Sequence, residues 1–268
     1  MDAYPAALLA VIAAPDAAAK QAALAAVPLP GDGDQWEQCA LPVRPGRPAH
    51  YVESTVAPKR RRTLAHGPSR QRFLLAIHHI ELSAIDLACA AALAGSGMPA
   101  AFHADQLAVA KDEAIHAQLI GGLLTERGWP PGCEPVHHRL WDAARACQDL
   151  GEILVVIPRF LEARGLDVSA DLLPRLATLD VEAHAVIQRI YTDEISHVTI
   201  GTRWHRYWCA QRGEDDEQHF RQVAKRHFSA QIPGPFALDQ PGRIQAGFTA
   251  AELQFLSSER DASAGSCL

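Results

Sequence analysis

The chain has few aromatic residues, no excess of basic residues and no paired cysteine motif. Aromatic residues make up 6% of the 268 positions and hydrophobic residues 48%, with many alanines and leucines, which favours helix over sheet. The formal net charge of -6 disfavours nucleic acid as the main partner, because phosphate binding needs a dense cationic face. The six cysteines form no C-x-x-C pair and suggest no disulfide framework, so we expect reduced thiols in a cytoplasmic protein.

The sequence also lacks a recognisable signal peptide or membrane span. Its N-terminus, MDAYPAALLAVIAAPDAAAKQAALAAV, is apolar but has no basic n-region and is interrupted by Pro15 and Asp16. An alanine-rich helical pair is expected there instead. No apolar stretch approaches the ~20 residues that cross a bilayer, so we expect no membrane partner.

Residues 1–68 are expected to form N-terminal helices and a proline-rich arm that pack on the core. Seven prolines scattered over residues 28–68 prevent a regular helix from persisting there. The run KRRR, Lys59 to Arg62, is either a solvated basic face or a docking patch. In an acidic chain the solvated face is favoured.

The region from 69 to 212 has a helical pattern almost throughout, with stop signals at GSGMP and GWPPG. The pattern predicts helices over residues 69–94 and 100–127, a third that starts after Pro135 and continues at least to Arg164, and a fourth over residues 180–212, with an irregular break and a short helix between 165 and 178. Four long helices with mostly short connections predict an all-α fold, an antiparallel four-helix bundle. Residues 213–256 are expected to form a C-terminal extension and residues 257–268 a disordered tail.

Two stretches of this region repeat one motif. KDEAIHAQ, residues 111–118, and TDEISHVT, residues 192–199, both carry Asp-Glu with a histidine three residues after the Glu. An offset of 81 residues aligns Glu81 with Glu162, Asp86 with Asp167, Asp112 with Asp193, Glu113 with Glu194, and His116 with His197. Either a decayed duplication or a chemistry needed twice explains these matches, and both explanations point to the same residues.

The helical stripe through each Glu-x-x-His motif is otherwise apolar. Glu113 and His116 share their stripe with Val109, Ala110 and Ile120. Burying carboxylates costs free energy unless cations neutralise them, and Lys or Arg is nearly absent from these stripes. Metal ions are the natural counter-charge.

The predicted metal ligands are Glu81, Glu113, His116, Glu162, Glu194 and His197. One Glu from each of two helices and a Glu-x-x-His from each of two others is the ligand set of di-iron and di-manganese carboxylate bundles. Glu81 and Glu113 each lie 16 residues from Gly97 in the intervening turn, so antiparallel helices bring them to the same height. The carboxylate excess favours two Fe ions, or Mn and Fe, over a closed zinc site.

Two glutamates, Glu152 and Glu162, are candidates for the metal ligand on the third helix. Glu152 shares its stripe with Arg145 and Arg159 and is expected to be solvated, so Glu162 is preferred. His78, one turn before the first ligand, is expected to be a hydrogen-bonded core histidine rather than a ligand.

Two aspartates fit a supporting role, because a ligating histidine needs an acceptor for its other ring nitrogen. We expect Asp112 to hold His197 and Asp193 to hold His116; the alternative is that both aspartates face solvent. Tyr191 is a candidate redox tyrosine, although core packing is favoured.

Four segments carry a resemblance to a known family. HHIELSAIDLACAAAL, VAKDEAIHAQLI, IPRFLEARGLDV and YTDEISHVTIGTRWH resemble a bacterial ferritin-like family catalogued as a domain of unknown function, and GPFALDQPGRIQAGFTAAEL is similar to its C-terminal extension. The resemblance implies the ferritin-like superfamily over about residues 42–256 and di-iron carboxylate motifs. The D-E-x-R-H motif of many oxygen-activating di-iron proteins is altered here, with Ile115 and Ser196 at the Arg positions.

Three functions follow as expectations. The first is a di-iron oxidoreductase, an oxygenase or oxidase, that uses dioxygen to oxidise an unidentified small-molecule substrate, with an electron donor as a further partner. The second is a ferritin-like iron-binding ferroxidase without an organic substrate. The third, a tRNA-modifying hydroxylase acting through KRRR, is disfavoured by the acidity of the chain. The long extensions favour a monomer or small oligomer.

Overall fold

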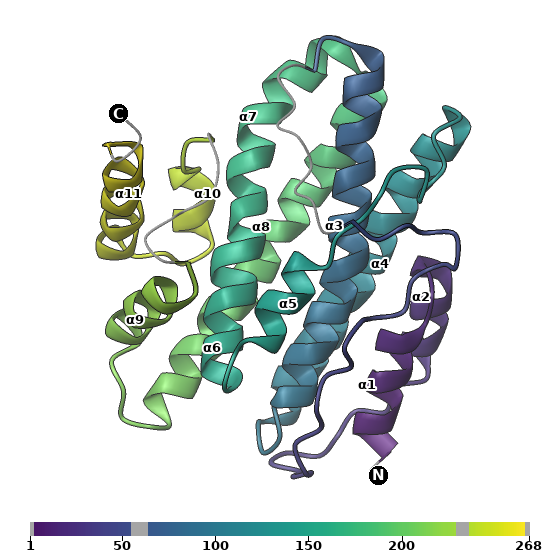
Figure 1. The fold of residues 1–268 in the computed structure, drawn as a ribbon. Coiled ribbons are helices and arrows are strands. Elements are labelled where there is room, and N and C mark those ends of the chain that lie inside the picture. The colour runs from purple at the N-terminus through teal and green to yellow at the C-terminus, as the bar shows by residue number, and fades with distance from the viewer. Residues whose placement is uncertain (1–2, 55–63, 229–235, 266–268) are drawn as a thin grey trace. The chain divides into compact units, whose positions relative to one another are not determined.

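The computed structural model describes residues 3–54, 64–228 and 236–265, with side chains up to residue 258. The regular secondary structure of the described residues is helical; they contain no strand, only an isolated bridge between Glu53 and Val136 (Figure 1). The elements are α1 (Ala3–Ala13), α2 (Ala17–Ala25), α3 (Gly67–Ala94), α4 (Ala100–Glu126), α5 (Arg139–Arg145), α6 (Leu150–Leu154), the π-helix η1 (Val155–Glu162), α7 (Ala163–Leu179), α8 (Val181–Ala210), α9 (Asp216–Phe228), α10 (Gln240–Gln245) and α11 (Ala250–Gly265). The predicted all-α class is confirmed.

Several predicted elements are found in the N-terminal half. The helical pair is α1 and α2, and the Asp16 side chain caps α2 by accepting from the Ala19 backbone. The proline-rich arm has no helix between residues 26 and 54. Helices α3 and α4 match the predictions to within two residues. The basic run from Lys59 to Arg62 lies outside the described residues.

The start of the predicted third helix is wrong, although the helical segment does continue past Arg164. No single helix runs from Pro135: α5 ends at Arg145, and a new helix begins after Asp149, whose side chain accepts from the Glu152 backbone. The predicted break at 165–178 does not exist either, because α7 runs through Gly165 and Pro174. The burial of Leu166, Leu172 and Leu176 stabilises α7 by more than Gly165 and Pro174 destabilise it.

The predicted disordered tail is also wrong over residues 257–265, which continue helix α11. This helix begins with a buried apolar face that includes Leu253, Phe255 and Leu256. A helix anchored by packing can extend into a polar segment of low hydrophobicity.

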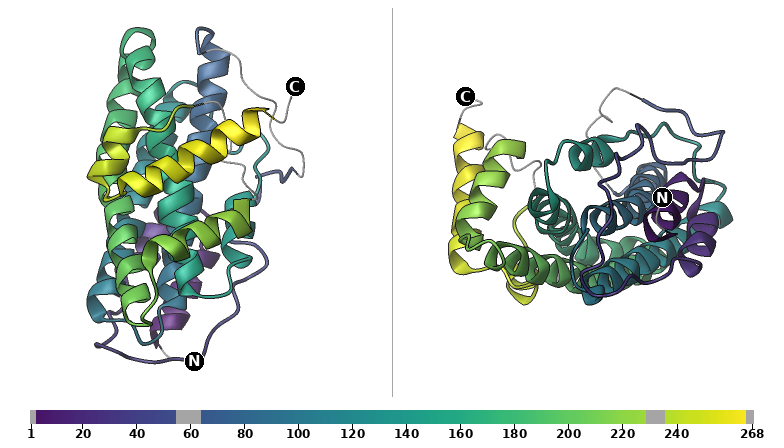
Figure 2. Two further views of the ribbon diagram at one scale, coloured as in Figure 1. Left: turned by 90° about the vertical axis from the view of Figure 1, so that its left-hand side faces the viewer. Right: turned by 90° about the horizontal axis from the view of Figure 1, so that it is seen from below.

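The chain divides into two compact units, the first made of Met1–Ala146 and Arg175–Val186 and the second of Cys147–Pro174 and Ile187–Leu268. The boundaries differ from those predicted, because residues 69–212 are shared between the units. Within the first unit, α3 and α4 lie side by side, and α1 and α2 lie against them (Figure 2).

A buried ion cluster fastens the N-terminal segment to α3. Nζ of Lys20 lies 2.6 Å from Oδ1 of Asp86 and 3.0 Å from the carbonyl oxygens of Val11 and Ile12. Nη1 of Arg47, from the arm, lies 2.7 Å from Oδ2 of Asp86. One carboxylate therefore holds both the helical pair and the arm on the core.

The second unit uses the aligned aspartate in the same way. Asp167 on α7 accepts from the backbone of Asp239 at 2.8 Å and pairs with Arg243 at 2.9 Å. Asp86 and Asp167, five residues after the aligned glutamates, thus each anchor a terminal extension within their own unit.

Among the described residues one helix, α3, is long and apolar enough by composition to cross a membrane. The expectation that no stretch approaches this length was wrong for α3. Its most apolar window is 78% buried inside the structure, and the core helix of a compact unit satisfies the same criterion.

Candidate metal centre

Helices α3 and α4 bring three predicted ligands together within the first unit. Nδ1 of His116 lies 3.3 Å from Oε2 of Glu81 and 3.4 Å from Oε2 of Glu113. The three side chains offer ligand atoms that all lie within 4.8 Å of one another, and all three are buried. This juxtaposition is the one expected from their equal spacing about Gly97, whose φ of 81° belongs to the turn between the helices.

The electrostatics of this cluster are those of a site that needs positive charge. Burial and the neighbouring Glu113 raise the pKa of Glu81 to about 8. Burial alone would lower the pKa of His116, but the adjacent carboxylates raise it to about 11. No Lys or Arg in the described part of the chain forms an ion pair with Glu81. The raised pKa values mean that Glu81 and His116 both hold protons at pH 7, and a divalent cation would displace these protons, because metal ligands must be deprotonated.

Helix α8 carries the second copy of the motif in the second unit. Glu194 and His197 lie one turn apart with Oε2 and Nδ1 separated by 3.9 Å, and both side chains are buried. The i, i+3 arrangement of Glu113 and His116 is thus repeated on another buried helical face.

The two candidates for the third-helix ligand have different surroundings. Glu152 is buried, contrary to the expected solvation, and it pairs with Arg226 and with Nε2 of His227 at 2.9 Å. It also accepts from the Gln148 backbone. Glu152 is therefore held by α9, which leaves Glu162, half-buried at the end of η1, as the preferred ligand.

The π-helix before Glu162 was not predicted. Its last turn is closed by the Ala163 backbone, which donates to the carbonyl of Pro158 five residues earlier. Pro158 has no N–H and cannot donate to a regular α-helical ladder. A proline within an apolar run is the sequence signal for such an irregular turn, and π-turns are frequent at functional sites.

The supporting residues are placed as follows. Asp193 pairs with Arg189 at 2.5 Å on the outer part of α8, while Asp112 is half-buried on α4. Their expected roles toward His197 and His116 stay predictions.

Tyr191 donates a hydrogen bond to Oδ2 of Asp239 at 2.7 Å. Burial and Asp239 raise the pKa of Tyr191 to about 12. Its hydroxyl therefore ties α8 to the C-terminal extension within the second unit.

Comparison with known proteins places this chain in a family. Residues 7–254 match the family described as "Protein of unknown function (DUF455)". The chain belongs to the DUF455 family. It is 35% identical over 214 residues to an uncharacterized protein of Haemophilus influenzae, covering 75% of this chain and 73% of that protein. No solved structure matches. The resemblance to a family of unknown function is confirmed.

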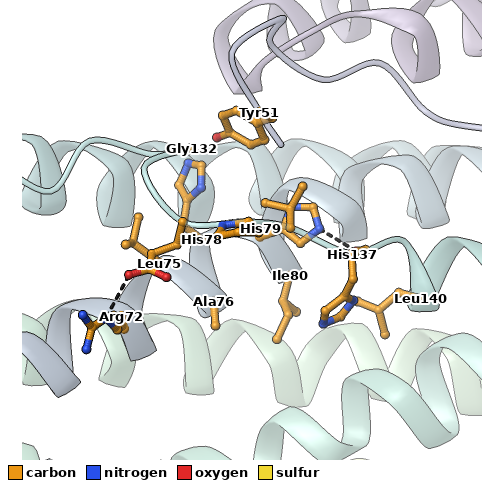
Figure 3. Close-up of a pocket in the computed structure, with 13 residues that line it drawn as sticks. Tyr51, Arg72, Leu75, Ala76, His78, His79, Ile80, Gly132, His137 and Leu140 are labelled. Atoms are coloured by element: carbon orange, nitrogen blue, oxygen red, sulfur yellow. Dashed lines mark hydrogen bonds and ion pairs between the residues drawn. The ribbon is translucent and has the colours of Figure 1, made fainter. Parts of the chain in front are cut away.

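This DUF455 protein also has a histidine-lined cavity of about 80 Å³ in its first unit, bordered by α3, the arm residue Tyr51 and the loop before α5 (Figure 3). Burial lowers the pKa of His78 to about 4 and that of His79 to about 3, so both imidazoles are neutral at pH 7. Nε2 of His79 lies 2.8 Å from the carbonyl oxygen of His137, to which it donates. His78 was expected in the core, but His79 was not predicted; the adjacent histidine pair is the sequence signal for it.

Proposed function

We propose that this DUF455 protein is a dinuclear metal oxidoreductase that uses dioxygen to oxidise a small molecule. The proposed scaffold is a ferritin-like four-helix bundle whose ligand helices are α3, α4, α8 and the η1–α7 segment. The observation that carries the proposal is the buried cluster of Glu81, Glu113 and His116, two carboxylates and an imidazole in an alanine-rich core.

The donor set fits a metal centre. Carboxylate oxygens and imidazole nitrogens suit Fe and Mn, and the excess of carboxylates distinguishes the set from a structural zinc site. In the first unit this chemistry comes from Glu81, Glu113 and His116. A single metal ion would leave the repeated motif on α8 unexplained.

We propose that Glu162, Glu194 and His197 complete the set, so that six side chains hold two Fe ions or one Mn and one Fe. Support comes from the repeat: Glu194 and His197 reproduce the buried i, i+3 pair of Glu113 and His116. The set would then equal the ligand pattern of di-iron and di-manganese carboxylate bundles.

Such a centre would supply one-electron and dioxygen chemistry when loaded. The chain itself contributes a dry apolar surround, formed in the first unit by residues such as Ala110, Ala114 and Ala117. The terminal extensions also matter: the arm is locked to α3 by Asp86 and supplies Tyr51 to the histidine-lined cavity. We assign these extensions the role of covering the bundle and limiting access to small molecules.

Metal analysis tests the proposal. Purified protein is expected to hold about two Fe or Mn per chain, as in related ligand sets. Glu113→Ala and Glu194→Ala should each lose most of this metal while keeping the helical circular dichroism of the wild type. Glu182→Ala is the matched control, because Glu182 lies on α8 but is exposed and pairs with Arg127. Equal metal content in all four proteins would refute the assignment.

A further inference from the structure

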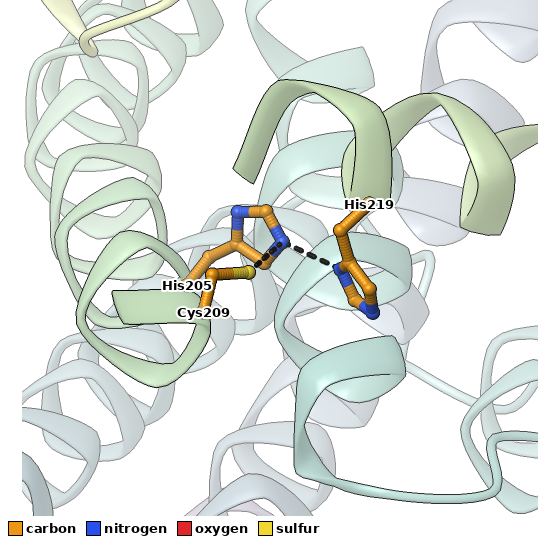
Figure 4. A group of neighbouring side chains, drawn as sticks. All are labelled: His205, Cys209 and His219. Atoms are coloured by element: carbon orange, nitrogen blue, oxygen red, sulfur yellow. Dashed lines mark hydrogen bonds between the residues drawn. The ribbon is translucent and has the colours of Figure 1, made fainter. Parts of the chain in front are cut away.

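A chain of hydrogen bonds connects η1, α8 and α9 within the second unit. Nη1 of Arg159 on η1 lies 2.8 Å from Nδ1 of His205 on α8. Nε2 of His205 in turn lies 2.9 Å from Nδ1 of His219 on α9 (Figure 4). Arg159 and His205 are fully buried, whereas His219 is half-buried. The chain therefore begins inside the unit and ends at a side chain that solvent reaches.

The guanidinium of Arg159 determines the position of each ring proton. A guanidinium can only donate hydrogen bonds, so Nδ1 of His205 accepts and its ring proton lies on Nε2. His205 donates this proton to Nδ1 of His219, which must therefore present a lone pair. The same assignment leaves His205 no lone pair toward His219 and Cys209, so these three side chains do not fit a metal ion.

The inner part of this chain is fixed by its own contacts. Nη2 of Arg159 pairs with Oε1 of Glu252 at 2.5 Å, and the guanidinium carbon lies 4.5 Å from the ring centre of Phe220. Burial and the positive charge of Arg159 lower the pKa of His205 to about 2. His205 therefore keeps one proton, on Nε2, and His219 is the member of the chain that titrates.

The surroundings of His219 favour its neutral form. The ring packs against the indole of Trp208 and the imidazole of His205, with ring centroids 5.2 Å and 5.1 Å away. The titratable and charged groups around it are His205 and Cys209 on α8, Asp149 before α6, Glu152 on α6, Glu214 before α9 and Arg226 on α9. Burial lowers the pKa of His219 by more than the three carboxylates raise it.

We propose that the contact between α8 and α9 is a pH-sensitive switch that opens when His219 is protonated. An imidazolium carries a proton on both nitrogens, so Nδ1–H of His219 would face Nε2–H of His205, and two donors cannot form a hydrogen bond. Because Arg159 prevents His205 from moving its proton, the start of α9 has to leave α8. The thiol of Cys209, fully buried beside His205, then becomes accessible.

Proton linkage gives the direction of the switch. In the released state His219 titrates as an exposed histidine, with a pKa of about 6.5, whereas in the docked state its pKa is lower. The docked state is therefore fully favoured above about pH 6.5 and loses stability as the pH falls below that value. Since release takes up one proton, its equilibrium constant rises by up to about tenfold per pH unit.

Labelling of Cys209 measures the release. The full-length protein is treated with a pyridyl disulfide, which also reacts with thiols in mild acid, and labelled peptides are quantified by mass spectrometry. The rate for Cys209 is divided by that for exposed Cys133, which removes the pH dependence common to thiols. This ratio should rise at least about tenfold between about pH 7.5 and about pH 5. A ratio that does not change with pH overturns the proposal.

One variant removes the titration and one serves as the control. In His219→Asn, the Oδ1 atom takes the place of Nδ1 and accepts from His205 without titrating, so the labelling ratio should stay low at every pH. His227→Asn removes the other histidine of α9, which pairs with Glu152, and should keep the rise. A rise in His219→Asn, or its loss in His227→Asn, overturns the proposal.

A second measurement covers the case in which His219→Asn labels rapidly at every pH. The titration of His219 in the wild type is then followed by NMR and compared with the midpoint of Cys209 labelling. Because one proton controls release, the two midpoints should coincide, and a difference of more than about one pH unit overturns the proposal equally.

Discussion

Nδ1 of His116 on α4 lies 3.3 Å from Oε2 of Glu81 on α3. This contact joins two neighbouring helices at a point where both are buried, so an acid and a base meet without solvent between them. Such a pair contributes little to stability once its desolvation is counted. Its presence in an alanine-rich core is better explained by ligand chemistry.

The first prediction separates an oxidoreductase from an iron-storage protein. Helices α1 and α2 cover one side of α3 and α4 in the first unit, so that surface is not free for building a closed cage. We expect a monomer or small oligomer by size-exclusion with light scattering. On addition of Fe(II) in air, the protein should consume oxygen in a limited burst related to its metal content. A large assembly that keeps tens of equivalents of iron in solution would favour storage instead.

The second prediction concerns the aspartates beside the ligands. Asp112→Asn and Asp193→Asn should each weaken metal binding by roughly ten- to a hundred-fold, because a ligating histidine loses the acceptor that orients it. Affinity is measured by metal titration against a competing chelator. Arg189→Ala is the control for Asp193, since it removes that residue's ion pair on α8 but leaves the carboxylate. If Asp193→Asn and Arg189→Ala behave alike, the aspartate serves only the surface pair.

The third prediction tests the buried ion pair between Lys20 and Asp86 on α3. Lys20→Met should lower the free energy of unfolding by about 3–5 kcal/mol, because it leaves the Asp86 carboxylate buried with half of its counter-charge removed. Urea unfolding measures the change. Arg44→Met provides the comparison: Arg44 pairs with Asp142, but both side chains are more than 40% exposed, so its loss should cost less than about 1 kcal/mol. Similar losses of unfolding free energy in the two variants would show that the buried Lys20–Asp86 pair stabilises the fold no more than an exposed pair does.

The fourth prediction tests the close approach of α8 to the π-helix. A Cβ added at Gly201 would lie 2.2 Å from Cβ of Pro158. Gly201→Ala should therefore force η1 away from α8 and cost about 1–3 kcal/mol of stability by overpacking. Gly165→Ala in α7 is the opposite case, because nothing lies within 4 Å of the added carbon. It should stabilise the helix by about 0.5–1 kcal/mol.

If η1 sets the direction of Glu162, Gly201→Ala should also lower metal content, whereas Gly165→Ala should not. Metal analysis of the two variants, performed as for the wild type, checks this. Full metal content in a folded Gly201→Ala protein would contradict a positioning role for the π-helix.

The sequence alone was sufficient for the features that depend on local periodicity. Helical spacing predicted α3 and α4 and the apolar stripes that carry Glu113 with His116 and Glu194 with His197, and all four side chains are buried. Equal spacing about Gly97 also predicted that Glu81 would meet Glu113. These features follow from 3.6 residues per turn and one short connection.

Tertiary structure decided the features that depend on partners distant in sequence. Glu152 looked solvated on its own helix, yet α9 buries it with Arg226 and His227. Helix α7 continues through Gly165 and Pro174 because packing outweighs their weak helical propensity. The pairing of His205 with His219 likewise required α9 to fold back on α8, a non-local contact that no single-helix pattern contains. Local periodicity determines which face of a helix is buried, whereas only the folded chain determines what that face meets.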